Sequence, residues 1–110
     1  MSLVRQVTEP EPSRAEIDAL AGPTLLEFGT SWCGHCRAAR PFIAAAFATH
    51  EGVRHVRIED GGSRRLGRTF GVKLWPTLVF LADGREFARV VRPRELAPIE
   101  AAFASIDTPA

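Results

Sequence analysis

Two cysteines three positions apart, Cys33 and Cys36, lie at the junction between two apolar segments of different periodicity, and this feature constrains the fold most. Residues 24–28 form a short apolar run suited to a buried strand, and the run stops at the polar segment 29–31. Residues 34–49 are rich in alanine, with larger apolar side chains at helical spacing. The pattern predicts a strand that leads directly into a helix, with Cys33 at the N-terminus of that helix.

Short strand and helix patterns alternate along the rest of the chain, without an internal repeat or a long linker. A capping box, Ser13 to Glu16, opens a short helix that reaches Leu20. Asp83-Gly84 has the composition of a tight turn and predicts a terminal hairpin. The other predicted elements are an edge strand at 3–7, strands at 53–58, 77–81 and 86–91, a helix at about 63–70 capped by Ser63, and a helix at about 94–105. This order implies an α/β fold in which helices cover both faces of a mixed sheet.

The length of 110 residues fits a single domain spanning residues 1–110. A chain of this size buries about two-thirds of its unfolded surface, so its core needs neither disulfide nor metal staples. The two cysteines are therefore free for chemistry. No apolar run has the length of a signal peptide or a membrane span. We therefore expect a cytoplasmic protein without membrane partners, or a periplasmic one if a leader has been removed, and we expect a monomer.

The formal net charge is only +1, although the chain carries fourteen basic residues. Arg64, Arg65 and Arg68 form the one arginine cluster. Proteins that bind nucleic acids usually carry a much larger net positive charge, and no nucleic-acid motif accompanies the cluster. A solvated helix face is the favoured interpretation, and no nucleic-acid partner is predicted.

The position of Cys33 at a helix N-terminus favours its thiolate, because unpaired backbone N–H groups and the helix dipole point at the sulfur. Cys36 lies further into the helix, less exposed, where it can attack a mixed disulfide formed by Cys33. A purely structural disulfide is disfavoured, because closing so short a loop removes little entropy. A zinc site needs about four ligands, and one cysteine pair with His35, His50 and His55 lacks a second close pair, so no metal is predicted.

The sequence Trp32-Cys33-Gly34-His35-Cys36 resembles the thioredoxin superfamily, in the Cys-Gly-His-Cys form typical of protein disulfide isomerase domains. Three separated features match as well, and the resemblance covers nearly the whole chain: Pro41 five residues after Cys36, Glu27 six residues before Cys33, and Trp75-Pro76-Thr77. The resemblance implies the thioredoxin fold, a three-layer α/β/α arrangement around a central mixed sheet of four to five strands.

The resemblance also implies roles for individual residues. Pro76 would be a cis proline beside the sulfurs, with the backbone of Trp75 pairing with the substrate chain, and Trp32 would form part of the apolar docking surface. Glu27 would transfer a proton with Cys36. On a core strand, burial disfavours the charged form of Glu27, although a strand of period 2 could also turn this side chain to the surface.

We expect the two residues between the cysteines, Gly34 and His35, to tune the reduction potential of the pair. His35, as a cation or a hydrogen-bond donor, would stabilise the Cys33 thiolate and make the pair more oxidising than a thioredoxin motif that contains proline.

Some positions depart from the family pattern. Gly29 stands where the family often has a bulky aromatic residue, and Trp75 replaces a small or β-branched residue. We expect Trp75 to compensate by leaning over Gly29, which would narrow substrate choice. The lysine that often accompanies the buried acid is absent, with His55 or Arg57 in its place. Residues 91–93 replace a common glycine beyond the terminal hairpin.

These residues predict a thiol–disulfide oxidoreductase that acts on protein disulfides or thiols and needs no cofactor. Its recycling partner would be a thioredoxin-reductase-like enzyme, glutathione or a membrane electron carrier. The expected compartment favours thioredoxin-like reduction, whereas His35 favours a disulfide oxidase or isomerase. A thioredoxin-fold binding module without catalysis is the third alternative, although it would commonly lose a cysteine or the proline.

Overall fold

The computed structural model of the chain describes residues 4–7, 11–61 and 65–107. Five strands in this part form one mixed sheet in the order β1-β3-β2-β4-β5. The strands β1, β3 and β2 are parallel to one another, whereas β4 is antiparallel to β2 and β5. The strands are β1 (Val4–Val7), β2 (Pro23–Gly29), β3 (Arg54–Glu59), β4 (Thr77–Ala82) and β5 (Arg85–Val91), and the helices are α1 (Arg14–Asp18), α2 (Gly34–Phe47), α3 (Leu66–Thr69) and α4 (Leu96–Ile106).

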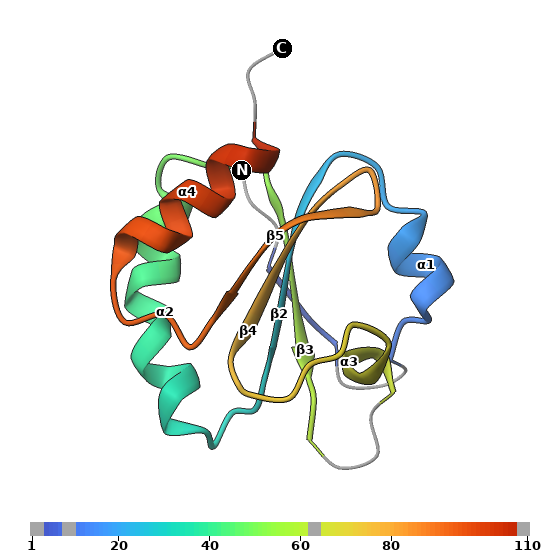
Figure 1. Cartoon of the computed structure of the whole chain (residues 1–110), viewed down its shortest axis with the longest axis horizontal. Coiled ribbons are helices and arrows are strands. Elements are labelled where there is room, and N and C mark those ends of the chain that lie inside the picture. Colours follow the sequence, from blue (N-terminus) through green and yellow to red (C-terminus); the bar gives the residue numbers. More distant parts are fainter. Residues whose placement is uncertain (1–3, 8–10, 62–64, 108–110) are drawn as a thin grey trace.

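Helices cover both faces of the sheet, with α2 and α4 on one side and α1 and α3 on the other (Figure 1). Side chains alternate between the two faces of a strand. Leu25 of β2 therefore packs in the cluster formed with α2 and α4, whereas Leu26 and Phe28 pack in the cluster formed with α1 and α3. The predicted three-layer α/β/α arrangement is confirmed, and the central strands are buried on both faces.

Two predicted helices end earlier than expected. The first helix ends at Asp18 rather than Leu20, because the N–H of Leu20 bonds to the carbonyl of Ile17 in a tighter turn. The second ends at Phe47 rather than Thr49, which bonds in the same way to the carbonyl three residues before it. The last turn of a helix often tightens in this manner, and sequence periodicity does not register it.

Two other helices begin later than expected. The predicted cap Ser63 lies outside the described residues. The helix α3 begins at Leu66, and Oε1 of Glu11 accepts the backbone N–H groups of Arg65 at 3.0 Å and Leu66 at 2.9 Å. A carboxylate at the N-terminus of a helix satisfies donors that have no partner within the helix. The final helix begins at Leu96, two residues after the predicted start.

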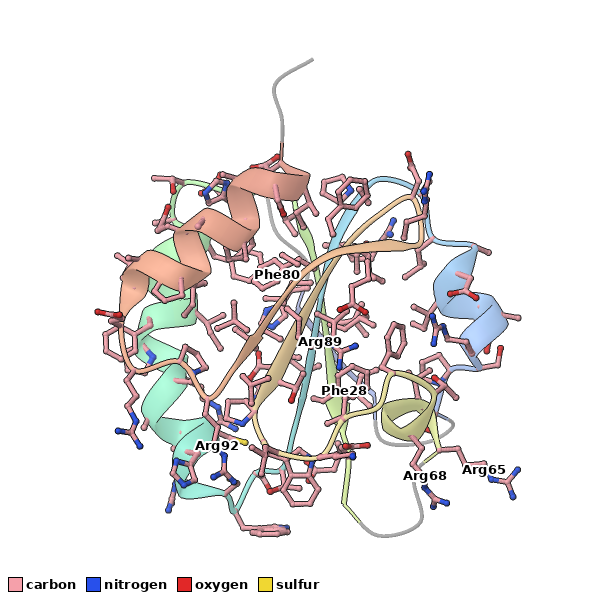
Figure 2. The ribbon with its side chains drawn as sticks, in the orientation of Figure 1. Phe28, Arg65, Arg68, Phe80, Arg89 and Arg92 are labelled. Carbon is pink, nitrogen blue, oxygen red and sulfur yellow. The ribbon has the colours of Figure 1, made fainter. Side chains whose placement is uncertain are left out.

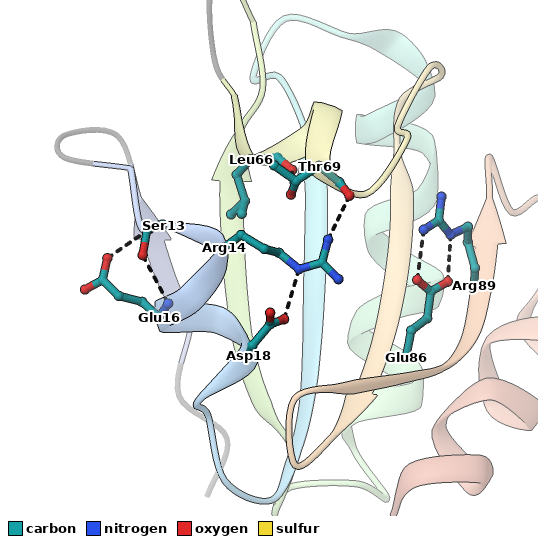
Figure 3. A network of polar contacts seen from close by, with 8 residues as sticks. All are labelled: Ser13, Arg14, Glu16, Asp18, Leu66, Thr69, Glu86 and Arg89. Carbon is teal, nitrogen blue, oxygen red and sulfur yellow. Dashed lines mark hydrogen bonds and ion pairs between the residues drawn. The ribbon is translucent and has the colours of Figure 1, made fainter.

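The short helices α1 and α3 are held together by Arg14, as Figure 3 shows. The predicted capping box is confirmed, since the side chains of Ser13 and Glu16 each bond to the backbone of the other residue. This cap fixes the start of α1, from which Nη1 of Arg14 donates to the carbonyl of Thr69 at 2.7 Å. The same guanidinium lies 3.8 Å from the centre of the Phe70 ring.

The hairpin between β4 and β5 turns through Asp83 and Gly84, which both have left-handed backbone conformations, with φ of 50° and 79°. Two residues with positive φ match the twist of the flanking strands. The turn also contacts the residue that precedes the neighbouring strand β2, because Oδ1 of Asp83 accepts the backbone N–H of Gly22 at 2.7 Å. A side chain at position 84 would overlap the backbone carbonyl of Asp18.

We expect Gly84→Ala to destabilise the fold by about 3 kcal/mol, because left-handed strain adds to overlap with the Asp18 carbonyl. Gly22→Ala is the matched control, since Gly22 also has positive φ but a Cβ there meets nothing within 4 Å. Its cost should be about 1 kcal/mol. Urea unfolding followed by circular dichroism measures both, and equal losses would show that the close approach to Asp18 has no effect.

Candidate active site

The two cysteines lie where β2 leads into α2, as the sequence predicted. Cys33 is the N-cap residue of α2, with φ of −78° and ψ of 123°, and its carbonyl accepts the backbone N–H of Arg37 at 3.1 Å. Both thiols are free. The exposed fraction is 8% for Cys33 and 2% for Cys36, so an incoming disulfide meets Cys33 first.

The surroundings of Cys33 stabilise its thiolate. Burial works against ionisation, but the polar backbone groups of Cys36 and His35 and the thiol of Cys36 favour the charged form of the sulfur. The positive charge of Arg92 acts in the same direction. Together these interactions lower the pKa of Cys33 below its ordinary value, as expected for a sulfur at a helix N-terminus.

The surroundings of Cys36 keep it protonated. Burial is the largest cause, and the interactions with Cys33 and the charge of Glu27 add to it, whereas a backbone hydrogen bond from Thr30 opposes them. The balance raises the pKa of Cys36 to about 11. Two neighbouring sulfurs therefore differ in role, since the outer one ionises readily and the inner one needs a proton acceptor.

Two tryptophans from different loops meet at the site: Trp32 precedes α2, and Trp75 precedes β4. The Trp75–Pro76 peptide bond is cis, as the resemblance implied. The ring of the half-buried Trp75 meets that of Trp32 edge to face, with the centroids 5.6 Å apart. Trp32 is 68% exposed and Leu74 is 47% exposed, so the rim of the site presents apolar surface.

Trp75 is held by Asp60, whose Oδ2 accepts the indole N–H at 2.9 Å. Burial raises the pKa of Asp60, and the hydrogen bond from Trp75 partly offsets this. The nearest neighbour of Gly29 is the inner sulfur: a Cβ at Gly29 would lie 2.6 Å from Sγ of Cys36 and 3.9 Å from Cβ of Pro76. The small residue at position 29 thus makes room for the inner sulfur.

Glu27 points into the core and is 5% exposed, which excludes the surface position. Its Oε1 lies 2.7 Å from Nε2 of the buried His55 and 3.9 Å from Nε of Arg57. The strand register places Glu27 opposite Arg57, and the side chain of His55 reaches the same carboxylate. Both basic residues therefore accompany the buried acid, where the sequence left the choice open. The imidazole of His55 also stacks on Phe47.

A small polar pocket connects Glu27 with Cys36. Two lining groups, Oγ1 of Thr30 and Nε of Arg40, are buried and have no hydrogen-bond partner within the described part of the chain. A pocket of this size with several polar partners suits a water molecule. The other lining residues are Gly29, Ser31, Arg57, Ile58 and Glu59.

Arg92 is the residue of the site that sequence reasoning missed. Its Nε donates to the carbonyl of Trp75 at 2.8 Å, and its backbone N–H donates to the carbonyl of Pro76 at 2.9 Å. The available signal was the replacement of a common glycine within residues 91–93. The imidazole of His35 is exposed, and the backbone of the same residue contributes to the lowered pKa of Cys33.

Within residues 4–7, 11–61 and 65–107, no group of three histidine, cysteine or acidic side chains could hold a metal ion. None of the helices in this described part combines the length and the apolar character that crossing a bilayer requires.

Comparison with known proteins agrees with this geometry. A family model described as Thioredoxin matches residues 5–105. Thioredoxin 2 from Pseudomonas aeruginosa PAO1, solved in its reduced form, is 59% identical, with a TM-score of 0.81 over 89% of this chain and 91% of that one. Thioredoxin from Chlamydia muridarum is 35% identical over 75 residues, 67% of this chain and 74% of the relative. Protein disulfide-isomerase erp38 from Neurospora crassa is 39% identical over 67 residues, which is 57% of this chain and only 18% of that protein.

The contribution of the inner thiol to the outer one is testable with two variants. Cys36→Ala removes a donor to the Cys33 sulfur and should raise the pKa of Cys33, whereas Cys36→Ser keeps a donor and should raise it less. The rate of alkylation by iodoacetamide against pH reports the thiolate of Cys33 directly. Identical profiles for the two variants would contradict the hydrogen bond as a cause.

Proposed function

The chain belongs to the thioredoxin family, and from this premise we propose that Cys33 and Cys36 are the nucleophilic and resolving cysteines of a protein-disulfide reductase. Members of this family are thiol–disulfide oxidoreductases that act on protein disulfides and are recycled by a reductase. The observation that carries the assignment is the opposite pKa shift of the two adjacent thiols. A binding module without catalysis has no need of this difference.

The first step is attack by the Cys33 thiolate on one sulfur of a substrate disulfide. A Cys33–substrate bond forms, the substrate disulfide breaks, and the second substrate sulfur leaves as a thiolate. In the next step Cys36 loses its proton and attacks the sulfur of Cys33. The Cys33–substrate bond breaks, the Cys33–Cys36 disulfide forms, and the substrate sulfur that was bonded to Cys33 leaves as a thiolate, so two electrons pass from the protein to the substrate.

Glu27 accepts the proton of Cys36 in this proposal. The inner thiol has a pKa of about 11, so it needs a base in order to react at neutral pH. The small polar pocket is lined by both residues, and a water there would carry the proton between them. His55 and Arg57 position the carboxylate, because both reach its Oε1.

Substrate binding in this proposal uses Trp32, Trp75 and Pro76. The exposed ring of Trp32 offers apolar contact, and the backbone of Trp75 offers polar groups to an extended substrate chain. Gly34 and His35 tune the redox pair, with the backbone N–H of His35 as one donor to Cys33. No cofactor takes part in these steps.

The comparisons favour reduction over oxidation or isomerisation. The chain matches thioredoxins over most of their length, whereas it spans a small part of the protein disulfide isomerase. The isomerase-type Cys-Gly-His-Cys motif supports the second candidate, a disulfide oxidase or isomerase. We place the reductase in the cytoplasm, where a thioredoxin-reductase-like enzyme or glutathione would keep the dithiol reduced.

The equilibrium reduction potential of the Cys33/Cys36 pair tests the direction. We expect a value closer to about −270 mV than to about −180 mV, because the chain matches thioredoxins over most of their length. Free thiols are counted after equilibration in graded glutathione buffers. A value near about −180 mV or above would assign the protein to oxidation or isomerisation instead.

The proton role is tested with Glu27→Gln, which keeps the size of the side chain and removes the base. Resolution of the mixed disulfide should slow on the order of tenfold or more at neutral pH, while attack by Cys33 is little changed. In this variant the rate of resolution should rise with pH towards the pKa of Cys36, about 11 in the unchanged protein. Stopped-flow measurement of both steps checks this, with Glu86→Gln, a remote pair with Arg89, as control. Unchanged resolution at neutral pH would exclude Glu27 as the base.

A further inference from the structure

Arg92 occupies a backbone group that the proposed function offers to substrates. It follows β5 directly, and its Nε donates to the carbonyl of Trp75 at 2.8 Å. Its backbone N–H donates to the next carbonyl, that of Pro76, at 2.9 Å. The side chain of Arg92 thus bonds to the backbone beside which an extended substrate would lie. Arg92 is labelled in Figure 2.

The backbone of Arg92 has a conformation that a side chain disfavours. Its φ is 49°, in the left-handed region where glycine has the advantage. Such a conformation persists when surrounding contacts hold it, and it is concentrated at binding and catalytic sites. The two bonds to the Trp75–Pro76 segment are contacts of this kind. They hold the guanidinium in one position beside the site, whereas an arginine side chain without such bonds would be flexible.

In the described part of the chain, no neighbouring carboxylate balances the charge of Arg92. Among the described residues, no acidic group lies within ion-pair distance of Arg92, whereas Arg14, Arg57 and Arg89 each have one. Asp60, the acidic residue that contacts Trp75, binds the indole rather than the backbone. Arg92 is therefore a cation fixed next to the reactive sulfur, and its charge favours the Cys33 thiolate.

The geometry of the guanidinium indicates what it can bind. One of its five N–H donors, at Nε, is used by Trp75, which leaves the four donors of the two terminal nitrogens. These present a planar pair that matches a carboxylate. Arg92 is also half-buried, so a carboxylate bound there would be less screened than one on the open surface.

We propose that Arg92 is a specificity-determining residue that selects disulfides flanked by acidic side chains. This inference rests on the proposed function, since it concerns how a substrate chain docks before Cys33 attacks. A carboxylate next to the substrate disulfide binds the terminal nitrogens of Arg92 while the substrate backbone lies along Trp75. A lysine at the same substrate position is repelled.

The experiment compares two disulfide-linked peptides of equal length, one with glutamate and one with lysine beside each cysteine. The rate of the first step is measured in single turnover for the wild-type dithiol. We expect the acidic peptide to react about tenfold faster, and the preference to shrink at high salt. In Arg92→Gln, which keeps a hydrogen-bond donor and the same backbone strain, the two rates should agree within about twofold.

The control is Arg94→Gln, an exposed arginine two residues further on that makes no hydrogen bond to Trp75. It should keep the wild-type preference. Equal rates for both peptides with the wild type would overturn the proposal, and so would an unchanged preference in Arg92→Gln. If Arg92 only holds the backbone in place, Arg92→Gln will slow the reaction of both peptides to the same extent and leave the preference unchanged, which would also overturn the proposal. If the wild type reduced neither peptide, the proposed function itself would fail.

Discussion

The stabilisation of the Cys33 thiolate by the first turn of α2 is the interaction on which the site depends. Donors that have no partner within the helix point at the N-cap residue, and here that residue is a thiol. Without them, burial alone would keep Cys33 protonated. The sheet contributes by delivering the chain from β2 into α2, so that the outer sulfur meets substrate and the inner sulfur stays covered.

In the proposed function the inner sulfur gives up a proton, and the fold places polar groups in the core beside it. Glu27 lies on the central strand of the sheet, between β3 and β4. A buried carboxylate is costly unless it has partners, and His55 and Arg57 provide them from the adjacent strand. Gly29, two residues further along β2, leaves the space that Cys36 occupies. The strand β2 thus carries the proposed base and leaves the space for the inner thiol.

The substrate side of the site is built from segments that are distant in sequence. Trp32 precedes the helix, Trp75 precedes β4, and Arg92 follows β5. The two rings contact each other, and Arg92 binds the backbone of Trp75. The two departures from the family pattern, Trp75 and Arg92, are therefore linked by the hydrogen bond to the Trp75 carbonyl. We expect a change of either residue to alter the surface that a substrate meets.

The sequence by itself determined the architecture and the identity of the reactive pair. Its periodicities predicted the strands, the helices and the hairpin, because burial on a strand or helix repeats every two or about 3.6 residues. The spacing around Cys33 predicted that this residue lies at a helix N-terminus, and therefore that it is the nucleophile, because the effect of a helix N-terminus is confined to its first turn. Only the tertiary structure decided that His55 and Arg57 share Glu27, that Trp75 leans on Trp32 and Asp60, and that Arg92 binds beside the sulfur. These contacts join residues far apart in the chain, so strand register and packing select the partners, and no local pattern records that choice.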